Sequence, residues 1–354
     1  MRSGSILARM LMSGSPAMSL DWQTIYNHLD CKSRADVRGL GLLGAGIPVC
    51  YGGIGGGLSD LCLLFELAGE RLSPLPLFGH LAVAAQAILA GGSEDQRQRW
   101  LPVLAKGEAI ASDGYCPELR IEDGVLVGTA PNVPHGAIAD VLLVSSDIGT
   151  WLVETDQTGV ALSEVEGNDS PIPTFEIAFS GASAEPLFDH DKAGLALHRS
   201  GYLALAAIAA GGTRRCLELA YQNADYRWVS QIAANYLSAQ IVVGTAAVAL
   251  ETGAIDGNVL LHHAKARAGE ALLDSVRLLS AEPARESGLL ETIYDLATGI
   301  ENLMGPASWH RGQAAIFLAA SPRPDRSDWN SCGRTPYPDH ARTQNFASRA
   351  SRAR

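Results

Sequence analysis

The chain contains 354 residues, of which 47% are apolar and 18% charged, and its mean hydropathy is close to zero at +0.08. Such a chain has enough apolar material for a large core and is globular rather than disordered, fibrous or membrane-spanning. Its formal net charge of −11 argues against a nucleic-acid partner, because binding to a phosphate backbone requires clustered Lys and Arg side chains.

The six cysteines are widely spread, with no CxxC pair and no histidine at zinc-finger spacing. The sequence therefore predicts neither a disulfide framework nor a metal site, and it favours a reducing, cytoplasmic location. The apolar run near the start is broken by Arg9 and is too short for a secretory signal or a membrane span. We expect residues 1–19 to form a disordered extension, and we expect no membrane partner.

Over residues 20–111 the sequence predicts a helical domain. Apolar residues recur at intervals of three and four over 61–72 and again over 81–89, which is the pattern of amphipathic helices. Ser93 precedes two acids and Gln96, a start signal in which the serine side chain caps the helix and the acids favour its positive end. A helix is expected to begin directly after Ser93.

Between residues 112 and 193 the apolar period changes to two, which predicts a small antiparallel β domain. Each expected strand is bounded by Gly, Pro, Asn or Asp, the residues that favour turns. The expected strands cover 125–129, 140–145, 149–154, 160–165 and 174–179.

Helical periodicity returns over residues 194–320 and predicts a C-terminal four-helix bundle. Its helices are expected over 201–223, 236–252, 259–279 and 289–303. The chain is therefore predicted to be an α+β protein with helices before and after the β domain. Residues 321–354 are rich in Pro, Ser and Arg without apolar periodicity, and we expect a disordered tail there.

Three sequence blocks follow one another in the first half of the chain: Y-G-G-I-G at 51–55, G-S-E-D-Q-R-Q-R-W-L-P-V-L-A-K-G-E at 92–108, and E-D-G-V-L-V-G-T-A at 122–130. Together they resemble the acyl-CoA dehydrogenase family. The resemblance covers roughly residues 35 to 305. It implies the fold of that family, in which an N-terminal helical domain and a C-terminal four-helix bundle enclose a small antiparallel β domain.

The resemblance also implies a flavoprotein that binds FAD and acts on an acyl thioester presented by CoA or by a carrier protein. In that family a glutamate removes the α-proton while the β-hydride moves to the flavin, which requires a base and an oxidant on opposite faces of the substrate. A homo-oligomer, dimer or tetramer, or a hetero-oligomer with a related subunit is implied as well.

The flavin-binding signatures of the family are altered in this chain. A loop of the form T-E-P-x-x-G-S-D is replaced by A-S-D-G-Y-C-P-E-L-R at 111–120, so the flavin-facing loop is shortened or lost. The next signature, whose Trp and Thr approach the flavin ring, falls on 131–136. There the chain has no Trp that could stack on the flavin ring. It has two hydrogen-bonding side chains, Asn132 and His135, which are candidates for cofactor binding.

Cationic residues provide two further candidate sites. Arg227 falls on the family's pyrophosphate-binding arginine, and a guanidinium suits a phosphate because it donates two parallel hydrogen bonds, although an ion pair with Asp225 is equally compatible with the sequence. A cationic edge on the third bundle helix either steers a phosphate-bearing carrier or only faces solvent. This edge comprises His262, His263, Lys265 and Arg267.

The family's catalytic glutamate falls, in its two branches, on His198 and on Gly305, neither of which is a carboxylate. The imidazole of His198 suits a base near pH 7, and the alternative is a partly exposed histidine without a role. Glu251 lies in a mostly apolar helix and suits a carboxylate of raised pKa in the acyl cleft, or else a solvated helix end. Glu301 lies close to three turns after Glu291, so that both acids can share one face, catalytic or merely exposed.

Three functions remain open at this point. The first is α,β-desaturation of an acyl thioester by a flavoprotein of specialised metabolism, such as lipid, steroid side-chain or natural-product metabolism. The second is a subunit whose own flavin site has decayed and which completes a heteromeric dehydrogenase. The third is a flavin-free enzyme on the same scaffold, such as a cyclase or a dehydratase.

Overall fold

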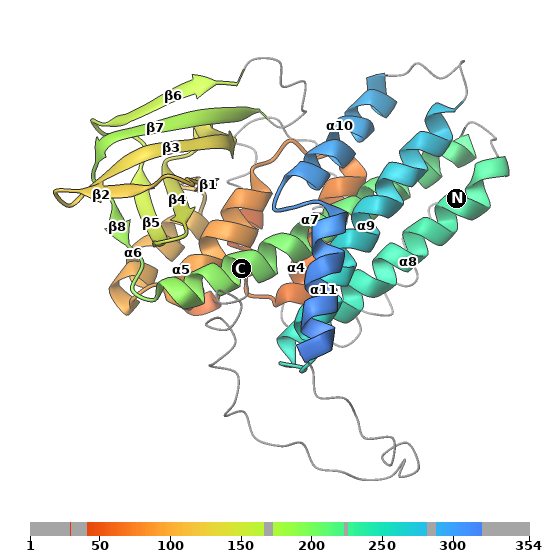
Figure 1. Cartoon of the computed structure of the whole chain (residues 1–354), viewed down its shortest axis with the longest axis horizontal. Coiled ribbons are helices and arrows are strands. Elements are labelled where there is room, and N and C mark those ends of the chain that lie inside the picture. Colours follow the sequence, from red (N-terminus) through yellow and green to blue (C-terminus); the bar gives the residue numbers. More distant parts are fainter. Residues whose placement is uncertain (1–28, 30–40, 166–172, 223–225, 282–287, 321–354) are drawn as a thin grey trace, which may run out of the picture. The chain divides into compact units, whose positions relative to one another are not determined.

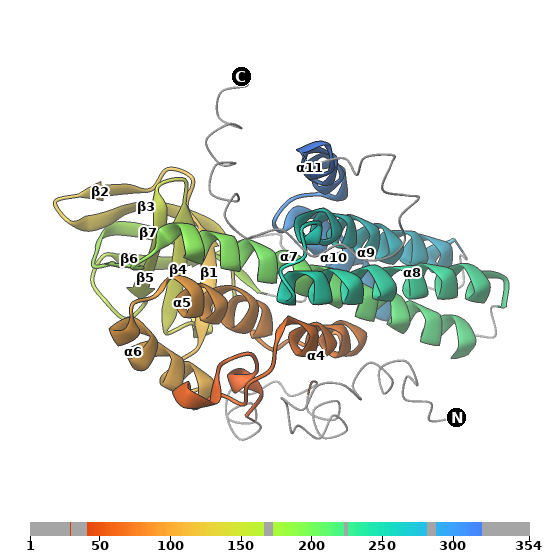
Figure 2. The ribbon, with the colours of Figure 1, turned by 90° about the horizontal axis from the view of Figure 1, so that it is seen from below.

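The computed structural model describes residue 29 and residues 41–165, 173–222, 226–281 and 288–320 (Figure 1). The predicted N-terminal extension and the predicted C-terminal tail lie outside these residues. Figure 1 shows the β-strands gathered on one side and helices α8, α9 and α10 on the other, with the long helix α7 passing from one group to the other. Figure 2 shows the same arrangement from below. The predicted domain bounds themselves stay predictions.

The first helical region contains α4 (Leu58–Arg71), the π-helix η3 (Phe78–Ala85), α5 (Gln86–Gly91) and α6 (Glu94–Ala105), after two short 3₁₀ turns, η1 (Leu42–Gly44) and η2 (Val49–Tyr51). The apolar positions predicted to face the core, such as Leu61 and Leu64, are buried. The predicted start of α6 is confirmed. Gln96 N donates to Ser93 Oγ at 3.1 Å, and Ser93 N donates to Gln96 Oε1 at 2.9 Å, so each side chain caps the other residue's backbone.

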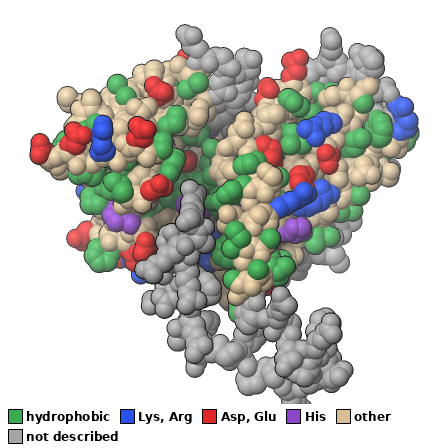
Figure 3. All heavy atoms as spheres, viewed as in Figure 1, with side chains coloured by type: hydrophobic (Ala, Val, Ile, Leu, Met, Phe, Trp, Pro, Cys, Tyr) green, Lys and Arg blue, Asp and Glu red, His purple; other side chains and the backbone are tan. Residues whose placement is uncertain are grey.

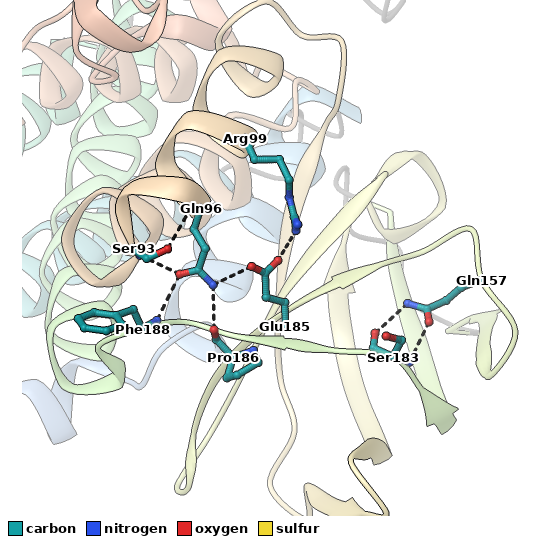
Figure 4. Close-up of polar contacts among 8 residues, drawn as sticks. All are labelled: Ser93, Gln96, Arg99, Gln157, Ser183, Glu185, Pro186 and Phe188. Carbon is teal, nitrogen blue, oxygen red and sulfur yellow. Dashed lines mark hydrogen bonds and ion pairs between the residues drawn. The ribbon is translucent and has the colours of Figure 1, made fainter.

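The start of α6 is also attached to the β region (Figure 4). Gln96 Nε2 donates to Glu185 Oε1 at 3.0 Å and to the carbonyl of Pro186 at 2.9 Å, and Phe188 N donates to Gln96 Oε1 at 3.3 Å. Arg99 forms an ion pair with Glu185. Gln96, the capping partner of Ser93, therefore also holds the chain in place at the end of β8.

The β region forms two four-stranded sheets with orders β1-β4-β5-β8 and β2-β3-β7-β6. Their strands are β1 (Ala111–Tyr115), β2 (Arg120–Glu122), β3 (Val125–Pro134), β4 (Val141–Ser146), β5 (Gly149–Glu154), β6 (Val160–Glu164), β7 (Thr174–Ala182) and β8 (Glu185–Pro186). All five predicted strands are confirmed. The predicted antiparallel pairing holds for every pair except β1 and β4, which are parallel.

The C-terminal helices are α7 (His190–Gln222), α8 (Tyr226–Glu251), α9 (Gly257–Ser280), α10 (Gly288–Asn302) and α11 (Ala307–Ala320). The four predicted helices are confirmed, and each begins before its predicted start. Helix α11 was not predicted as a separate element. Helix α7 packs against α4, α5, α8 and α9, and a Cβ atom at Gly211 would lie 1.9 Å from the carbonyl oxygen of Glu66. Glycine at this position is what allows α7 and α4 to approach closely.

Helices α7 and α8 are long and apolar enough to cross a membrane by length and composition alone. In their most apolar windows, however, 67% of the α7 residues and 50% of the α8 residues are buried inside the protein, as in core helices of soluble proteins. On the face shown in Figure 3, the Lys and Arg side chains of the described residues are interspersed with Asp and Glu side chains.

Candidate functional site

A cavity of about 680 Å³ lies where the helical and β regions meet. Its walls come from α4, the segment between α4 and η3, the ends of β3 and β7, α7 and α10. Most of the lining is apolar, and it includes Phe65, Leu72, Phe78, Leu205, Ile208 and Ile300. The volume falls within the range of about 300–1,000 Å³ that is usual for small-molecule sites.

Two predicted cofactor-binding residues, Asn132 and His135, line this cavity at the end of β3. Asn132 lies in an irregularity of the β3–β7 ladder between Ala130 and Val133, with φ at 57°, and is exposed. His135 is buried, its Nε2 lies 3.0 Å from the carbonyl oxygen of Pro74, and burial lowers its pKa. A neutral imidazole donates to that carbonyl, so His135 fixes the segment before η3 and leaves Asn132 as the more available donor.

Helix α10 contributes a polar face that the sequence analysis missed. Asp295, Thr298 and Asn302 all line the cavity, whereas Glu291, which we expected to share one face with Glu301, is exposed and is not among the lining residues. The intervals of three and four residues between these side chains place them on one face of a helix. That spacing was the signal available in the sequence.

His198 and Gly305, the two positions assigned to the family's glutamate, lie on α7 and between α10 and α11, and neither is among the residues that line the cavity. The ring of His198 lies 5.6 Å from the ring of Tyr202, centroid to centroid. A Cβ atom at Gly305 would lie 3.6 Å from Nε2 of His310. His310 and Tyr202 are in edge-to-face contact at 4.7 Å, so both positions border one group of rings.

We name this group the histidine cluster and define it as Tyr202, His262, Lys265, Trp309 and His310. His262 Nδ1 and His310 Nδ1 are 2.8 Å apart. Lys265 is fully buried and its Nζ donates to the carbonyl of Ile300 at 2.9 Å and to that of Gly305 at 3.2 Å. The expected cationic edge on α9 is therefore wrong for His262 and Lys265, which face the interior, while the neighbouring His263 is exposed.

The other predicted catalytic acids lie outside the cavity lining. Glu251 accepts hydrogen bonds from Ser59 N at 2.9 Å and Ser59 Oγ at 2.7 Å, so it caps the start of α4. Glu301 Oε2 accepts from Ala307 N at 3.0 Å at the start of α11, and its buried Oε1 has no hydrogen-bond partner among the described residues. Glu301 is thus part of the support around the histidine cluster rather than a surface acid.

Arg227 stands at the exposed start of α8, where its guanidinium lies 5.7 Å from the ring of Trp228. It is not among the residues that line the cavity. In the described parts of the chain, no group of three or more His, Cys, Asp or Glu side chains is placed to hold a metal ion.

Comparison with known proteins agrees with this architecture. Residues 26–108 match the family model "Acyl-CoA dehydrogenase, N-terminal domain". Acyl-CoA dehydrogenase FadE34 of Mycobacterium tuberculosis is 31% identical over 202 residues, which is 54% of this chain and 26% of that protein. The chain is a relative of the acyl-CoA dehydrogenases. It spans about a quarter of the length of the first two curated relatives that it matches, 26% and 25%.

Solved acyl-CoA dehydrogenase structures share the fold. Glutaryl-coenzyme A dehydrogenase in complex with glutaryl-CoA superposes with a TM-score of 0.74 at 18% identity, covering 90% of this chain and 96% of that one. The ChsE4-ChsE5 complex from Mycobacterium tuberculosis gives a TM-score of 0.71 at 18% identity, covering 89% and 92%.

The residues that acyl-CoA dehydrogenases devote to FAD do not fit that cofactor within this chain alone. No Lys or Arg is among the described residues that line the cavity, although the two phosphates of FAD require cations or backbone donors. In β1, which replaces the flavin-facing loop, the Ser112 hydroxyl donates to the carbonyl of Pro134. The carboxyl of Asp113 is buried against Gly79, and burial raises its pKa to about 7. The Ser112 hydroxyl is thus bonded to the protein itself, whereas Oδ1 of Asp113 is buried without a hydrogen-bond partner among the described residues.

Proposed function

We propose that this chain provides the acyl-thioester site of a heteromeric acyl-CoA dehydrogenase, in which a related partner subunit holds the FAD required for α,β-desaturation. The observation that carries the proposal is the cavity, which is large, mostly apolar and without a described lining cation. An acyl chain fits such a lining because its burial is favoured by the hydrophobic effect, whereas a pyrophosphate does not fit it.

The polar part of the lining suits the thioester end of the ligand. Asn132 is exposed at the cavity and carries an amide that can donate to a thioester carbonyl. CoA or a carrier protein then remains outside, where the negatively charged phosphates stay hydrated. The size of the cavity is compatible with the acyl groups of lipid, steroid side-chain or natural-product metabolism.

The heteromeric assembly is supported by two observations. Arg227, which the resemblance assigns to the family's pyrophosphate arginine, is exposed at the start of α8 and is not among the residues that line this chain's own cavity. The ChsE4-ChsE5 structure shares this fold and is a complex of two chains. A related subunit that retains the flavin signatures is therefore the proposed partner.

A flavin-free enzyme of the cyclase or dehydratase type is the second candidate. It is favoured by the histidine cluster, in which the Nδ1 atoms of two buried imidazoles, His262 and His310, lie 2.8 Å apart. Histidine is the most common general acid or base and needs no flavin, but burial lowers the pKa of both residues and makes each a weaker base.

The acyl site can be tested with palmitoyl-CoA by isothermal titration calorimetry. Gly299 lines the cavity, and a Cβ atom at this position meets nothing within 4 Å. Gly299→Phe should therefore fill the cavity and weaken palmitoyl-CoA binding at least tenfold without destabilising α10, because glycine inside a helix is itself unfavourable by about 0.5–1 kcal/mol. Gly244→Phe on α8, where a Cβ atom also meets nothing within 4 Å, is the matched control and should bind like the wild type.

Absorbance spectroscopy separates the candidate functions. The proposal predicts that the chain purified alone is colourless and that the assembly with a flavin-retaining partner is yellow. A yellow, active homo-oligomer contradicts the heteromeric proposal. Turnover by a colourless chain supports the flavin-free enzyme instead.

A further inference from the structure

The wall that α10 contributes to the cavity has two chemically different sides. Asp295, Thr298 and Asn302 form one side, which we name the polar stripe. Leu296 and Ile300 form the other side and are buried. Because an α-helix has about 3.6 residues per turn, the intervals of three and four residues within each set place its members on a common side of the helix. The same helix therefore presents a polar and an apolar surface to the cavity.

The polar stripe extends along the cavity wall rather than marking a single point on it. Asp295 and Asn302 are seven residues apart in one continuous helix, which corresponds to about 10 Å along its axis. A thioester carbonyl is a single acceptor and cannot engage a stripe of this length. The polar stripe therefore faces other parts of a bound acyl group.

The walls contributed by the neighbouring helices are apolar. Phe65 of α4 and Leu205 of α7 are buried, and Ile208 of α7 is half-buried. The cavity thus has apolar sides on α4 and α7 and a polar side on α10. A complementary ligand buries apolar surface against α4 and α7, and it presents polar groups to α10, because polar side chains that lose water need new hydrogen-bond partners.

The polar stripe offers mainly hydrogen-bond acceptors. Thr298 Oγ1 donates to the carbonyl oxygens of Tyr294 at 3.1 Å and Asp295 at 3.0 Å, so its proton is used and its lone pairs remain. The carboxylate of Asp295 accepts at about four positions, so a partner within the protein leaves room for a ligand. Asn302 both donates and accepts, and its amide has no hydrogen-bond partner among the described residues. A ligand therefore has to bring donors to this stripe.

Hydroxyl groups are the donors that suit these surroundings. Asp295 is the one Asp, Glu, Lys or Arg among the described residues that line the cavity, and a hydroxyl that donates to it forms a charge-assisted hydrogen bond. A carbonyl or ether oxygen only accepts, and an unsubstituted methylene chain would cover the stripe without replacing the hydrogen bonds to water that it displaces. An ammonium group also donates, but burying its charge beside apolar walls costs more than burying a hydroxyl.

We propose that the polar stripe of α10 determines the specificity of the acyl site and selects acyl groups that carry a hydroxyl over unsubstituted acyl chains. This inference rests on the proposed acyl site. Asp295 is the main acceptor for the hydroxyl, and Thr298 is a second acceptor one turn further along the helix. The stripe acts on affinity for the acyl group, and no bond in the ligand is made or broken there.

The first test compares three ligands by isothermal titration calorimetry on the full chain: palmitoyl-CoA, 10-hydroxypalmitoyl-CoA and 16-hydroxypalmitoyl-CoA. The hydroxylated ligands place one donor in the middle or at the end of the same chain. At least one of them should bind about tenfold more tightly than palmitoyl-CoA, which is the effect of one hydrogen bond to a charged group. If palmitoyl-CoA binds and neither hydroxylated ligand binds more tightly, the inference is overturned and the acyl site is retained. If none of the three binds, the acyl site itself is contradicted.

The second test assigns the preference to the polar stripe. Asp295→Leu removes the main acceptor and enlarges the apolar wall, so the preference should be lost while palmitoyl-CoA binds at least as tightly as to the wild type. Thr298→Val replaces the hydroxyl with a methyl group of similar size and should reduce the preference by about threefold, which keeps the test informative if Asp295→Leu does not fold.

Glu291→Leu is the matched control for these variants. Glu291 lies one turn before Asp295 on the same helix, is exposed and is not among the lining residues, so this variant should keep the wild-type preference. An unchanged preference in both Asp295→Leu and Thr298→Val overturns the role of the polar stripe. An equal loss of preference in Glu291→Leu overturns it as well.

Discussion

The cavity and the histidine cluster lie next to each other and treat polar groups in opposite ways. In the cavity, polar side chains such as Asn132 stand among apolar residues and have room for a ligand. In the histidine cluster, three of the five side chains are held by hydrogen bonds inside the protein: Lys265 to two carbonyls, His310 to a third and His262 to His310. The difference separates a cavity with room for a ligand from a cluster whose polar groups are bonded to the protein itself.

The largest expected effect comes from removing the amine that supports the cluster. Lys265→Met leaves the carbonyls of Ile300 and Gly305 without their donor and Glu301 without its nearby cation. We expect the free energy of unfolding to fall by about 3 kcal/mol, as measured by urea denaturation. The exposed Lys106→Met is the control and should change it by less than about 0.5 kcal/mol. Equal losses in the free energy of unfolding for the two substitutions contradict a stabilising role of the Lys265 hydrogen bonds.

Acidification should weaken the histidine cluster. The pKa values of His262 and His310 in the folded chain lie below the ordinary 6.5. As the pH falls below 6.5, these two histidines therefore become protonated in the unfolded chain but stay neutral in the folded chain. Stability is therefore lost with falling pH, down to about 4 for His262 and about 3 for His310, with a limiting slope near ~1.4 kcal/mol per pH unit for each histidine.

This pH dependence can be isolated by comparing variants. His262→Gln should lose part of the slope between pH 6.5 and 4, whereas His263→Gln should retain it. The other groups that face the pair, His198, Lys265, Tyr202 and Glu301, are the same in both variants. Parallel stability curves for the two variants contradict a buried neutral His262.

A smaller effect is expected where the two regions touch. Gly201→Ala places a methyl group 2.7 Å from Sδ of Met304, and the flexible side chain must move. We expect a loss of about 1 kcal/mol in the free energy of unfolding. Gly194→Ala on the same helix meets nothing within 4 Å and should be neutral or stabilising. Equal free energies of unfolding for Gly201→Ala and Gly194→Ala contradict close packing of Met304 against Gly201.

The smallest effect is expected for Glu251, which belongs to neither region. Glu251→Gln weakens the hydrogen bonds to Ser59 at the start of α4 and should lower stability by no more than about 1 kcal/mol. Its affinity for palmitoyl-CoA should equal that of the wild type. A tenfold loss of affinity contradicts this placement and indicates that Glu251 contributes to the acyl site.

The sequence predicted the fold well where the signal is local. The helix that starts after Ser93 follows from a cap and a capping partner three residues apart, and the apolar stripe of α4 follows from its period. Strand β1 was missed because A-S-D-G-Y has no apolar alternation and its partner, β4, lies thirty residues away in a parallel pair. Such pairing is decided by tertiary contacts that no short window contains.

The candidate site was less predictable for the same reason. Asn132 and His135 were found because they occupy a family position, but Asp295 was not singled out, because α10 contains several acids and only packing distinguishes the one that lines the cavity. His262 and Lys265 were placed on a cationic edge because charge in a sequence usually marks an exposed face. Their burial depends on α11 and on carbonyls contributed by the α10–α11 turn, which the periodicity of α9 cannot reveal.

The claim that the cavity binds an acyl thioester is tested most directly by the affinity for palmitoyl-CoA of two matched variants, Gly299→Phe and Gly244→Phe. The account predicts that Gly299→Phe loses at least tenfold in affinity, whereas Gly244→Phe binds like the wild type. If Gly299→Phe also binds like the wild type, the cavity is not the acyl site.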